Sequence, residues 1–426
     1  MGHVIIIGNG ISGITAARHI RKRSDHRITV ISAETDHFYS RTALMYIYMG
    51  HMKYEHTKPY EDWFWEKNRI ELKRAYVQSV QPENNTITLD SGEKMTYDDL
   101  IIASGSSPNK FGWPGQDLKG VQGLYSYQDL EAMERDTKGI KRAVVVGGGL
   151  IGIEMVEMLL SRQIPVTFVV REKSFWNGVL PSEESDMINT HIREHHVDLR
   201  LSTELKEIKT DESGRAKSVI LSDGEELDCQ FVGLTVGVHP NIEFLKDSGI
   251  EVKKGVCVDE HLRSNIKNIY ALGDCAQQRV PIANRRPIEP VWYTGKIMGE
   301  TVAATICGSP TSYNPGIWFN SAKFMDIEYQ TYGTVPAVLP EGETSFYWEC
   351  AKRKRAIRIV YDKESKEVKG FNAMGVRLKQ EVCAGWIKSK AQITEVVSGL
   401  SRANFDPEFF KKFEKEVQNK FQTTSA

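Results

Sequence analysis

Two glycine-rich segments have the residue types and the spacing needed to hold phosphate groups. One reads VIIIGNGISG and the other reads VVVGGGLIGIE. The glycines at GxGxxG spacing are Gly8, Gly10 and Gly13 in the first segment and Gly147, Gly149 and Gly152 in the second. Such glycines allow a tight turn between a strand and a helix, whose N-terminal N–H groups then bind a pyrophosphate. A chain with two of these turns is expected to hold two dinucleotides.

Charged residues beyond each turn are expected to contact the ribose of the bound dinucleotide. In the first unit this residue is Glu34, about 20 positions after the glycines, where a carboxylate accepts hydrogen bonds from ribose hydroxyls. In the second unit Arg171 and Glu172 occupy the corresponding place. A carboxylate favours the ribose diol of NADH and a guanidinium favours the extra phosphate of NADPH. Both cofactors therefore stay open, with a preference for NADH.

Each glycine turn must be positioned by a βαβ unit. Apolar runs with helical segments between them predict both units. The expected elements are a strand at Val4–Ile7, a helix from Ser12 to Arg21, a strand at Ile28–Ile31, a second unit starting at Ala143, and its strand at Val166–Val170. Further strands are expected at Thr86–Leu89, Leu100–Ala103 and Gly255–Val258, and a helix near Gly295–Ile306.

The residue pattern of the chain changes at Tyr313, where aromatic residues begin to alternate with charged ones. Alternation such as that at Ala356–Val360 predicts an antiparallel sheet and a separate C-terminal domain. At its end, Asp406 can cap a helix with Pro407 in its first turn. The helix would carry Phe409, Phe410, Phe413, Val417 and Phe421 on one face, docked on its own domain or offered to a partner.

Composition excludes several classes of protein. The 426 residues carry a formal net charge of −1, which does not favour a nucleic-acid partner. No apolar run approaches the roughly 18 residues of a transmembrane helix, and the chain enters a strand at Val4 without a leader, so we expect a cytoplasmic protein. The six cysteines form no CxxC pair, which predicts buried structural thiols and no metal site.

Two further motifs support a family resemblance. The segment DDLIIASGSSP (98–108) follows the first glycine turn, and NIYALGDCA (268–276) follows the second. This order of motifs resembles that of two-dinucleotide-domain flavoprotein reductases. This family includes ferredoxin and rubredoxin reductases, the flavoprotein part of nitrite reductases, and apoptosis-inducing factor. The resemblance implies an α/β fold in which two Rossmann-like domains, the FAD domain interrupted by the NAD(P) domain, precede a C-terminal α+β domain. The expected segments are 1–112 and 242–312 for FAD, 113–241 for NAD(P)H, and 313–426 for the C-terminal domain.

The resemblance also implies which residues bind FAD and NADH or NADPH. Expected near FAD are Gly8, Asn9, Gly10, Ile11, Ser12, Gly13, Glu34, Arg41, Val77, Ser104, Gly105, Gly273, Asp274, Val291 and Trp292. Expected near the nicotinamide cofactor are Gly147, Gly149, Leu150, Ile151, Gly152, Arg171, Glu172 and Gly237. Asp274 would bind the ribityl chain, and Trp292 would stack on the flavin or belong to the core. Glu154 is the candidate catalytic residue because it is similar to the family glutamate near the nicotinamide; a helix-surface carboxylate is the alternative.

Departures from the family patterns limit the chemistry. The segment FYSRTALMY has Arg41 and Thr42 where thiol-dependent members carry a cysteine, so thiol chemistry is not expected. Arg41 matches an arginine of ferredoxin reductases, whereas Tyr46 replaces their lysine near the flavin. Electrons would therefore leave through the flavin itself, and the identity of the acceptor stays open.

The resulting hypothesis is an NAD(P)H-dependent FAD oxidoreductase. Its expected acceptor is a ferredoxin- or rubredoxin-type carrier; the alternatives are a quinone or other small acceptor, or a flavin-bearing binding protein resembling apoptosis-inducing factor. The basic run Lys352–Arg355, with Arg358, would steer an acidic carrier or form an ordinary solvated turn. A homodimer is possible on this reading.

Overall fold

The computed structural model describes residues 2–282, 285–405 and 412–425. The chain divides into two compact units. Unit 1 comprises residues 1–111, 122–138 and 237–315, and unit 2 comprises residues 112–121, 139–236 and 316–426. Residues 122–138, which the sequence analysis placed in the nicotinamide segment, thus cluster with unit 1. The four-segment division itself stays a prediction.

Unit 1 is built around a five-stranded parallel sheet with the order β19-β7-β1-β2-β3. Its strands are β1 (His3–Ile7), β2 (Arg27–Ser32), β3 (Ile70–Arg74), β7 (Asp99–Ile102) and β19 (Ile269–Ala271). The apolar strands β1 and β7 lie at the centre of the sheet and are almost wholly buried, as expected for a parallel sheet covered on both faces. The strand order reverses beside β1, which places the turn after β1 at the switch point where α/β sheets bind ligands.

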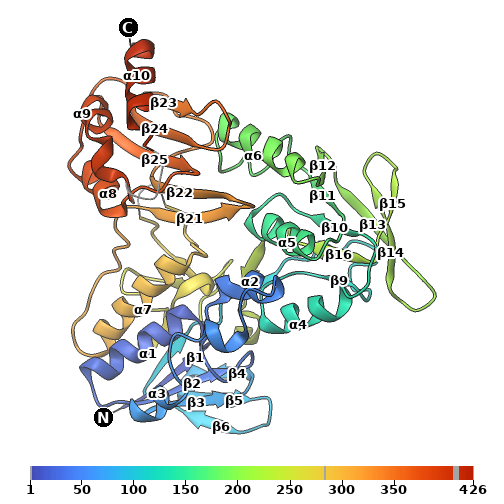
Figure 1. The fold of residues 1–426 in the computed structure, drawn as a ribbon. Helices are drawn as coiled ribbons and strands as arrows, with labels where there is room; N and C mark the ends of the chain where they lie inside the picture. The colour runs from blue at the N-terminus through green and yellow to red at the C-terminus, as the bar shows by residue number, and fades with distance from the viewer. Residues whose placement is uncertain (1, 283–284, 406–411, 426) are drawn as a thin grey trace. The chain divides into compact units, whose positions relative to one another are not determined.

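Two helices of unit 1 lie side by side, as Figure 1 shows for α1 (Ile11–Arg23) and α7 (Trp292–Ile306). The remaining helices are α2 (Leu44–Tyr48), α3 (Trp63–Lys67) and α4 (Tyr127–Asp136). Smaller sheets pair β4 (Val77–Gln81), β5 (Thr86–Leu89) and β6 (Lys94–Thr96); β8 (Ser106–Pro108) and β17 (Val238–Pro240); and β18 (Val256–Val258) and β20 (Ala276–Gln278).

Unit 2 contains a second five-stranded sheet with the order β12-β11-β10-β16-β9, in which β12, β11, β10 and β16 pair in parallel. Its strands are β9 (Val121–Gln122), β10 (Ala143–Val146), β11 (Val166–Val170), β12 (Asp198–Leu201) and β16 (Phe231–Leu234). The helices are α5 (Leu150–Ser161) and α6 (Ser182–Glu194), and β13 (Leu205–Thr210), β14 (Ala216–Leu221) and β15 (Glu226–Asp228) form an antiparallel sheet. The second predicted βαβ unit is confirmed, including the strand at Val166–Val170.

The C-terminal part of unit 2 is an antiparallel sheet with helices packed against it. The sheet order is β21-β22-β25-β24-β23, formed by β21 (Phe319–Phe324), β22 (Ile327–Gly333), β23 (Glu343–Glu349), β24 (Ala356–Asp362) and β25 (Val368–Met374). The helices are α8 (Gln380–Lys388), α9 (Ile393–Ser398) and α10 (Glu414–Ser425), drawn together in red in Figure 1. The predicted α+β domain with antiparallel pairing is confirmed.

The last helix docks on its own domain. Phe413 and Val417 are buried, and the Phe413 ring stacks on Trp348 with ring centroids 5.9 Å apart. This outcome favours the docked alternative over a partner-binding helix. The predicted cap at Asp406, the first turn at Pro407, and the predicted face residues Phe409 and Phe410 lie outside the described residues. Among the described residues, no helix is both long enough and apolar enough to cross a membrane.

Candidate dinucleotide-binding sites

The first glycine turn is closed by backbone on two sides and open at its centre. Gly8 has φ of 110°, and a Cβ atom there would lie 2.1 Å from the carbonyl oxygen of Ala103. A Cβ on Gly13 would lie 2.1 Å from the carbonyl oxygen of Gly8, so the helix and strand pack against each other without side chains between them. A Cβ on Gly10 would meet no atom within 4 Å. The turn therefore leaves space for a ligand only at its second glycine.

The second glycine turn has the same geometry. Gly147 has φ of 117°, and its Cβ would lie 2.4 Å from the carbonyl oxygen of Thr235. A Cβ on Gly152 would lie 2.2 Å from the carbonyl oxygen of Gly147. A Cβ on Gly149, like one on Gly10, would meet no atom within 4 Å. The two turns thus reproduce the three roles of the fingerprint glycines, namely the tight turn, the close approach of pyrophosphate, and helix–strand packing.

The helix after the first turn begins at Ile11, and its N-cap residue Gly10 has no side chain to accept from the first backbone N–H groups. The exposed N–H groups of such a first turn attract anions. Asn9 is buried and donates to the Thr35 carbonyl oxygen at 2.8 Å, which ties the turn to the loop after β2. Ser12 is buried, and both Gly273 and Gly295 pack directly against it. A Cβ atom would lie 2.5 Å from the Ser12 hydroxyl oxygen if placed on Gly273 and 2.4 Å from it if placed on Gly295. Three segments of unit 1 therefore converge closely on the start of α1.

Asp274 lies in this convergence, in the short helical turn after β19. Its carboxylate accepts hydrogen bonds from the hydroxyls of Ser106 and Tyr125, each at 3.2 Å. Burial raises the pKa of Asp274, and the Tyr125 and Ser106 hydroxyls oppose that rise. Gly273, with φ of 74°, turns the chain at the strand end so that the aspartate can face this cluster. A carboxylate in this place can accept from the hydroxyls of a sugar-alcohol chain.

Glu34 is held by protein groups on both carboxylate oxygens. Arg41 donates at 2.6 Å to one oxygen and at 2.8 Å to the other, and the Tyr39 hydroxyl donates at 2.5 Å. The Tyr127 backbone N–H adds a bond of 2.9 Å. Burial by itself would raise the pKa of Glu34, but the Arg41 guanidinium and these hydrogen bonds lower it. Contact between ribose hydroxyls and Glu34 stays a prediction, and such hydroxyls would have to share a carboxylate that Arg41 already engages.

Tyr125 connects the Glu34 cluster to Asp274, and the sequence analysis did not identify it. The Arg41 guanidinium lies 4.4 Å from the centre of the Tyr125 ring and donates to the Tyr125 carbonyl oxygen at 2.5 Å. The Tyr125 hydroxyl in turn accepts from the Ser106 N–H at 2.9 Å and donates to Asp274. The only sequence signal nearby is the capping box formed by Ser126 and Asp129, which marks the start of α4.

The two chain segments that cross between the glycine-turn domains pair with each other inside unit 1. Strands β8 and β17 are antiparallel, and they lie beside the predicted residues Ser104, Gly105 and Gly237. The Ser104 hydroxyl donates to the Asn241 carbonyl oxygen at 2.6 Å, and the Asn241 N–H donates to the Gly105 carbonyl oxygen at 2.9 Å. Gly237 adopts φ of 89° in the second crossover. These residues lie together in unit 1, and their contact with a cofactor stays a prediction.

Three other predicted residues of unit 1 have ordinary structural positions. Val77 is the buried first residue of β4. Val291 is the N-cap of α7, and Trp292 is that helix's first residue. The Trp292 side chain is 38% exposed, which excludes the core alternative and leaves its ring available to a ligand. Stacking on a flavin stays a prediction.

In the second dinucleotide site, Leu150 and Ile151 begin helix α5 directly after the glycine turn. Arg171 and Glu172 follow the end of β11 and form an ion pair with each other at 3.0 Å. Arg171 is exposed and Glu172 is partly exposed. Since the guanidinium and the carboxylate lie together, the geometry does not choose between NADH and NADPH.

Glu154 lies one turn into α5 and is partly exposed. Burial raises its pKa to about 7, the neighbouring Glu157 carboxylate contributes to the rise, and Lys323 opposes it. Lys323 itself pairs with Glu157 at 2.7 Å. Glu154 can therefore hold or release a proton near neutral pH, which an ordinary surface carboxylate does not do. Its predicted role near the nicotinamide is not decided by this position.

The basic run differs from the prediction at Arg358. Arg358 is 5% exposed and binds the carboxylates of Glu183 and Glu184 at 2.8 Å, so it is a structural ion pair and not part of a steering surface. Lys352–Arg355 forms the turn between β23 and β24, where Lys354 pairs with Glu194. Five of the six cysteines are buried, as expected, and Cys307 is partly exposed.

Comparisons with known proteins agree with this geometry. Residues 2–290 match the family described as pyridine nucleotide-disulphide oxidoreductase. The chain is 28% identical to a nitrite reductase [NAD(P)H] of Bacillus subtilis over 78% of its own length, and it spans 40% of that relative. It is 30% identical to the 5,5'-dehydrodivanillate O-demethylase ferredoxin reductase subunit of a Sphingobium species, with 78% of this chain and 82% of the relative covered. The fold matches that of a putidaredoxin reductase–putidaredoxin complex with a TM-score of 0.81 at 19% identity, covering 100% of this chain and 99% of that one.

Proposed function

Because the chain belongs to the pyridine nucleotide-disulphide oxidoreductase family, we propose that it is an NAD(P)H-dependent FAD oxidoreductase that delivers electrons to a ferredoxin- or rubredoxin-type carrier. One observation carries the proposal. Both glycine turns are closed by backbone at their first and third glycines and open at the second, at Gly10 and Gly149. That shape fits the pyrophosphate of a dinucleotide, and it occurs twice in one chain.

The residues of unit 1 fit FAD. The N–H groups at the start of α1 would hold the pyrophosphate, and Asp274 would accept from the ribityl hydroxyls, with Tyr125 and Ser106 keeping its carboxylate in place. When bound, the flavin and nicotinamide supply hydride transfer and the release of single electrons. The protein's own contribution is binding, orientation and the exclusion of water.

The residues of unit 2 fit the nicotinamide dinucleotide. The start of α5 would hold its pyrophosphate, and Arg171 and Glu172 would face its adenosine ribose. Glu154, whose pKa is raised to about 7, would hold a proton on its carboxylate without a fixed negative charge. No side chain is assigned as a nucleophile, because the segment where thiol-dependent relatives carry a cysteine has Arg41 and Thr42.

A carrier protein is the proposed acceptor, and the relative of similar length that is named a ferredoxin reductase subunit supports this choice. In the basic turn Lys352–Arg355, Arg353 pairs with Glu349 and Lys354 pairs with Glu194, so Lys352 and Arg355 would provide the long-range attraction for an acidic carrier. Because the Debye length falls from about 10 Å at 0.1 M salt to about 3 Å at 1 M, carrier reduction is expected to slow as salt rises. Cytoplasmic placement and a homodimer stay predictions.

An anaerobic titration tests the function. The FAD-loaded chain is mixed with NADH or NADPH, and flavin bleaching is followed by absorbance. We expect rapid bleaching, and rapid cytochrome c reduction only after an iron–sulfur carrier is added. Gly149→Ala is the matched variant, because it should slow bleaching while FAD stays bound. Slow bleaching that gives a persistent charge-transfer complex, with no acceleration by any carrier, would contradict the reductase and favour the binding-protein alternative.

A further inference from the structure

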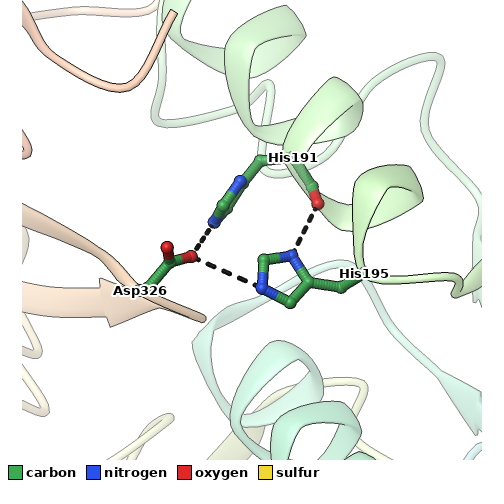
Figure 2. A group of neighbouring side chains, drawn as sticks. All are labelled: His191, His195 and Asp326. Carbon is green, nitrogen blue, oxygen red and sulfur yellow. Dashed lines mark hydrogen bonds and ion pairs between the residues drawn. The ribbon is translucent and has the colours of Figure 1, made fainter.

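Two imidazoles and one carboxylate gather at the end of α6 in unit 2. His191 lies in the last turn of α6, His195 is the helix C-cap, and Asp326 lies in the turn between β21 and β22 (Figure 2). All three residues belong to unit 2, and one ligand atom from each lies within 4.8 Å of the other two. The proposed oxidoreductase function uses none of these side chains.

Local structure explains why the three groups meet. Residues four positions apart lie on the same face of a helix, so His191 and His195 project in one direction. Met325, with φ of 56°, reverses the chain between β21 and β22 and presents Asp326 at the tip of the turn. Figure 2 shows both rings turned toward the Asp326 carboxylate.

We propose that His191, His195 and Asp326 bind one divalent transition-metal ion, with zinc as the preferred ion. Neutral imidazole nitrogens and a carboxylate oxygen form a donor set that zinc accepts, with a fourth position left for water. The bound ion would link α6 to the β21–β22 turn and so fasten the C-terminal sheet to the domain that carries the second glycine turn.

The distances allow an ion to enter. The His195 Nε2 atom lies 3.5 Å from Asp326 Oδ1. Two ligands that are each about 2.0–2.1 Å from zinc in tetrahedral geometry lie about 3.3 Å apart, which matches that separation. His191 Nε2 lies in direct contact with the same oxygen, so the carboxylate must move by about 1 Å to admit the ion. Asp326 is 69% exposed and is free to make this movement.

Burial holds the His191 ring in place. His191 is 1% exposed, and its Nε2 atom directly contacts the Asp326 carboxylate. A ring that is already fixed with this nitrogen toward the carboxylate loses little further freedom when it binds an ion.

Neighbouring groups orient both rings for coordination. His195 Nδ1 lies 3.0 Å from the His191 carbonyl oxygen, so it carries the proton and leaves the Nε2 lone pair directed at the site. The Glu194 carboxylate lies 3.6 Å from His191 Nδ1 and can accept a hydrogen bond from it when Nε2 binds the ion. The Lys354 ammonium approaches His191 Nδ1 as a donor, so His191 coordinates through Nε2 only when this ammonium turns away from the ring toward Glu194, with which it pairs at 2.5 Å.

Metal titration of the full chain tests this proposal. The protein is freed of metal with a chelator and titrated with ZnCl2 in a calorimeter, and with CoCl2 while the visible absorption is recorded. We expect one equivalent to bind, with a cobalt spectrum typical of nitrogen and oxygen ligands. His195→Ala and Asp326→Asn should each weaken zinc binding at least tenfold. Neither side chain is fully buried, so both variants are expected to fold, and circular dichroism checks this.

His196→Asn is the matched control. His196 is an exposed neighbouring histidine with φ of 60°, a conformation that asparagine tolerates, and it lies outside the cluster. This variant should bind zinc as the wild-type chain does. The proposal is overturned if the wild-type chain shows no saturable zinc binding, or if either His195→Ala or Asp326→Asn binds zinc as tightly as the control. None of these results depends on electron transfer, so failure here is distinct from failure of the proposed function.

Discussion

Replacement of Gly10 by alanine should separate cofactor binding from protein stability. Gly10 has φ of −70° and ψ of −179°, a conformation that alanine adopts readily, and its Cβ would meet no protein atom within 4 Å. The folded chain therefore gains no clash. Since alanine restricts the unfolded chain more than glycine does, the cofactor-free protein should be unchanged or more stable by about 0.4–1 kcal/mol.

The same methyl group would occupy the space in which the pyrophosphate approaches the backbone. Displacement of the phosphate would lengthen or break one hydrogen bond from an N–H group to a charged oxygen, which contributes about 1.5–3 kcal/mol. Since about 1.4 kcal/mol corresponds to a tenfold change, FAD affinity should fall roughly 10- to 100-fold. Gly149→Ala should weaken NADH or NADPH binding by a similar factor and leave FAD affinity unchanged.

Flavin fluorescence during FAD titration of the cofactor-free chain measures the affinity, and urea unfolding measures stability. Gly385→Ala is the matched control, because Gly385 lies in α8, also faces open space and is far in sequence from both glycine turns. This control should keep wild-type FAD affinity. The reasoning is refuted if Gly10→Ala binds FAD as tightly as the control, or if its loss of affinity is accompanied by an equal loss of stability.

Three further predictions concern charged residues. Arg171→Ala should lower kcat/KM for NADPH more than for NADH, because it removes the guanidinium available to the extra phosphate; equal losses would contradict this. Arg358→Met should lower the free energy of unfolding by about 3–5 kcal/mol, because it leaves the buried Glu184 carboxylate unpaired. The control Lys209→Ala breaks an exposed ion pair and should change the free energy of unfolding by about 1 kcal/mol or less. Urea titrations measure both values. The pKa of Glu154 is raised to about 7 in the folded chain. Protonation of Glu154 therefore stabilises the folded state fully below the unfolded-state pKa, and this stabilisation is lost as the pH rises through about 7. The free energy of unfolding of Glu154→Gln, minus that of the wild-type chain, should therefore increase from pH 5 to pH 8. A difference that stays constant over this range would exclude the raised pKa.

Much of the fold was predictable because its signals are local. Apolar β-branched runs predicted β1 and β11, and the glycine spacing predicted the helices that follow, since parallel strands buried on both faces have a distinctive composition. Predicted helix ends differed by one to two residues, as for α1, which extends to Arg23. The alternation at Ala356–Val360 was enough to predict an antiparallel strand.

The side-chain clusters were less predictable because their members are distant in sequence. Glu34 and Asp274 were found from motifs, but Tyr125, which lies between their clusters, has no motif of its own. Arg358 was read as part of a basic surface, because a charge run does not show that Glu183 and Glu184 will be packed against one of its members.

The sequence by itself determined the two glycine turns, their order and the absence of a cysteine beside the first of them, because each depends on residues close together in the chain. The tertiary structure decided which side chains share a cluster. It placed Arg41 on Glu34, Arg358 on the buried Glu184, and Asp326 beside His191, although the last two residues are far apart in sequence. Such contacts depend on how strands are ordered and how sheets and helices pack, which local sequence patterns do not encode.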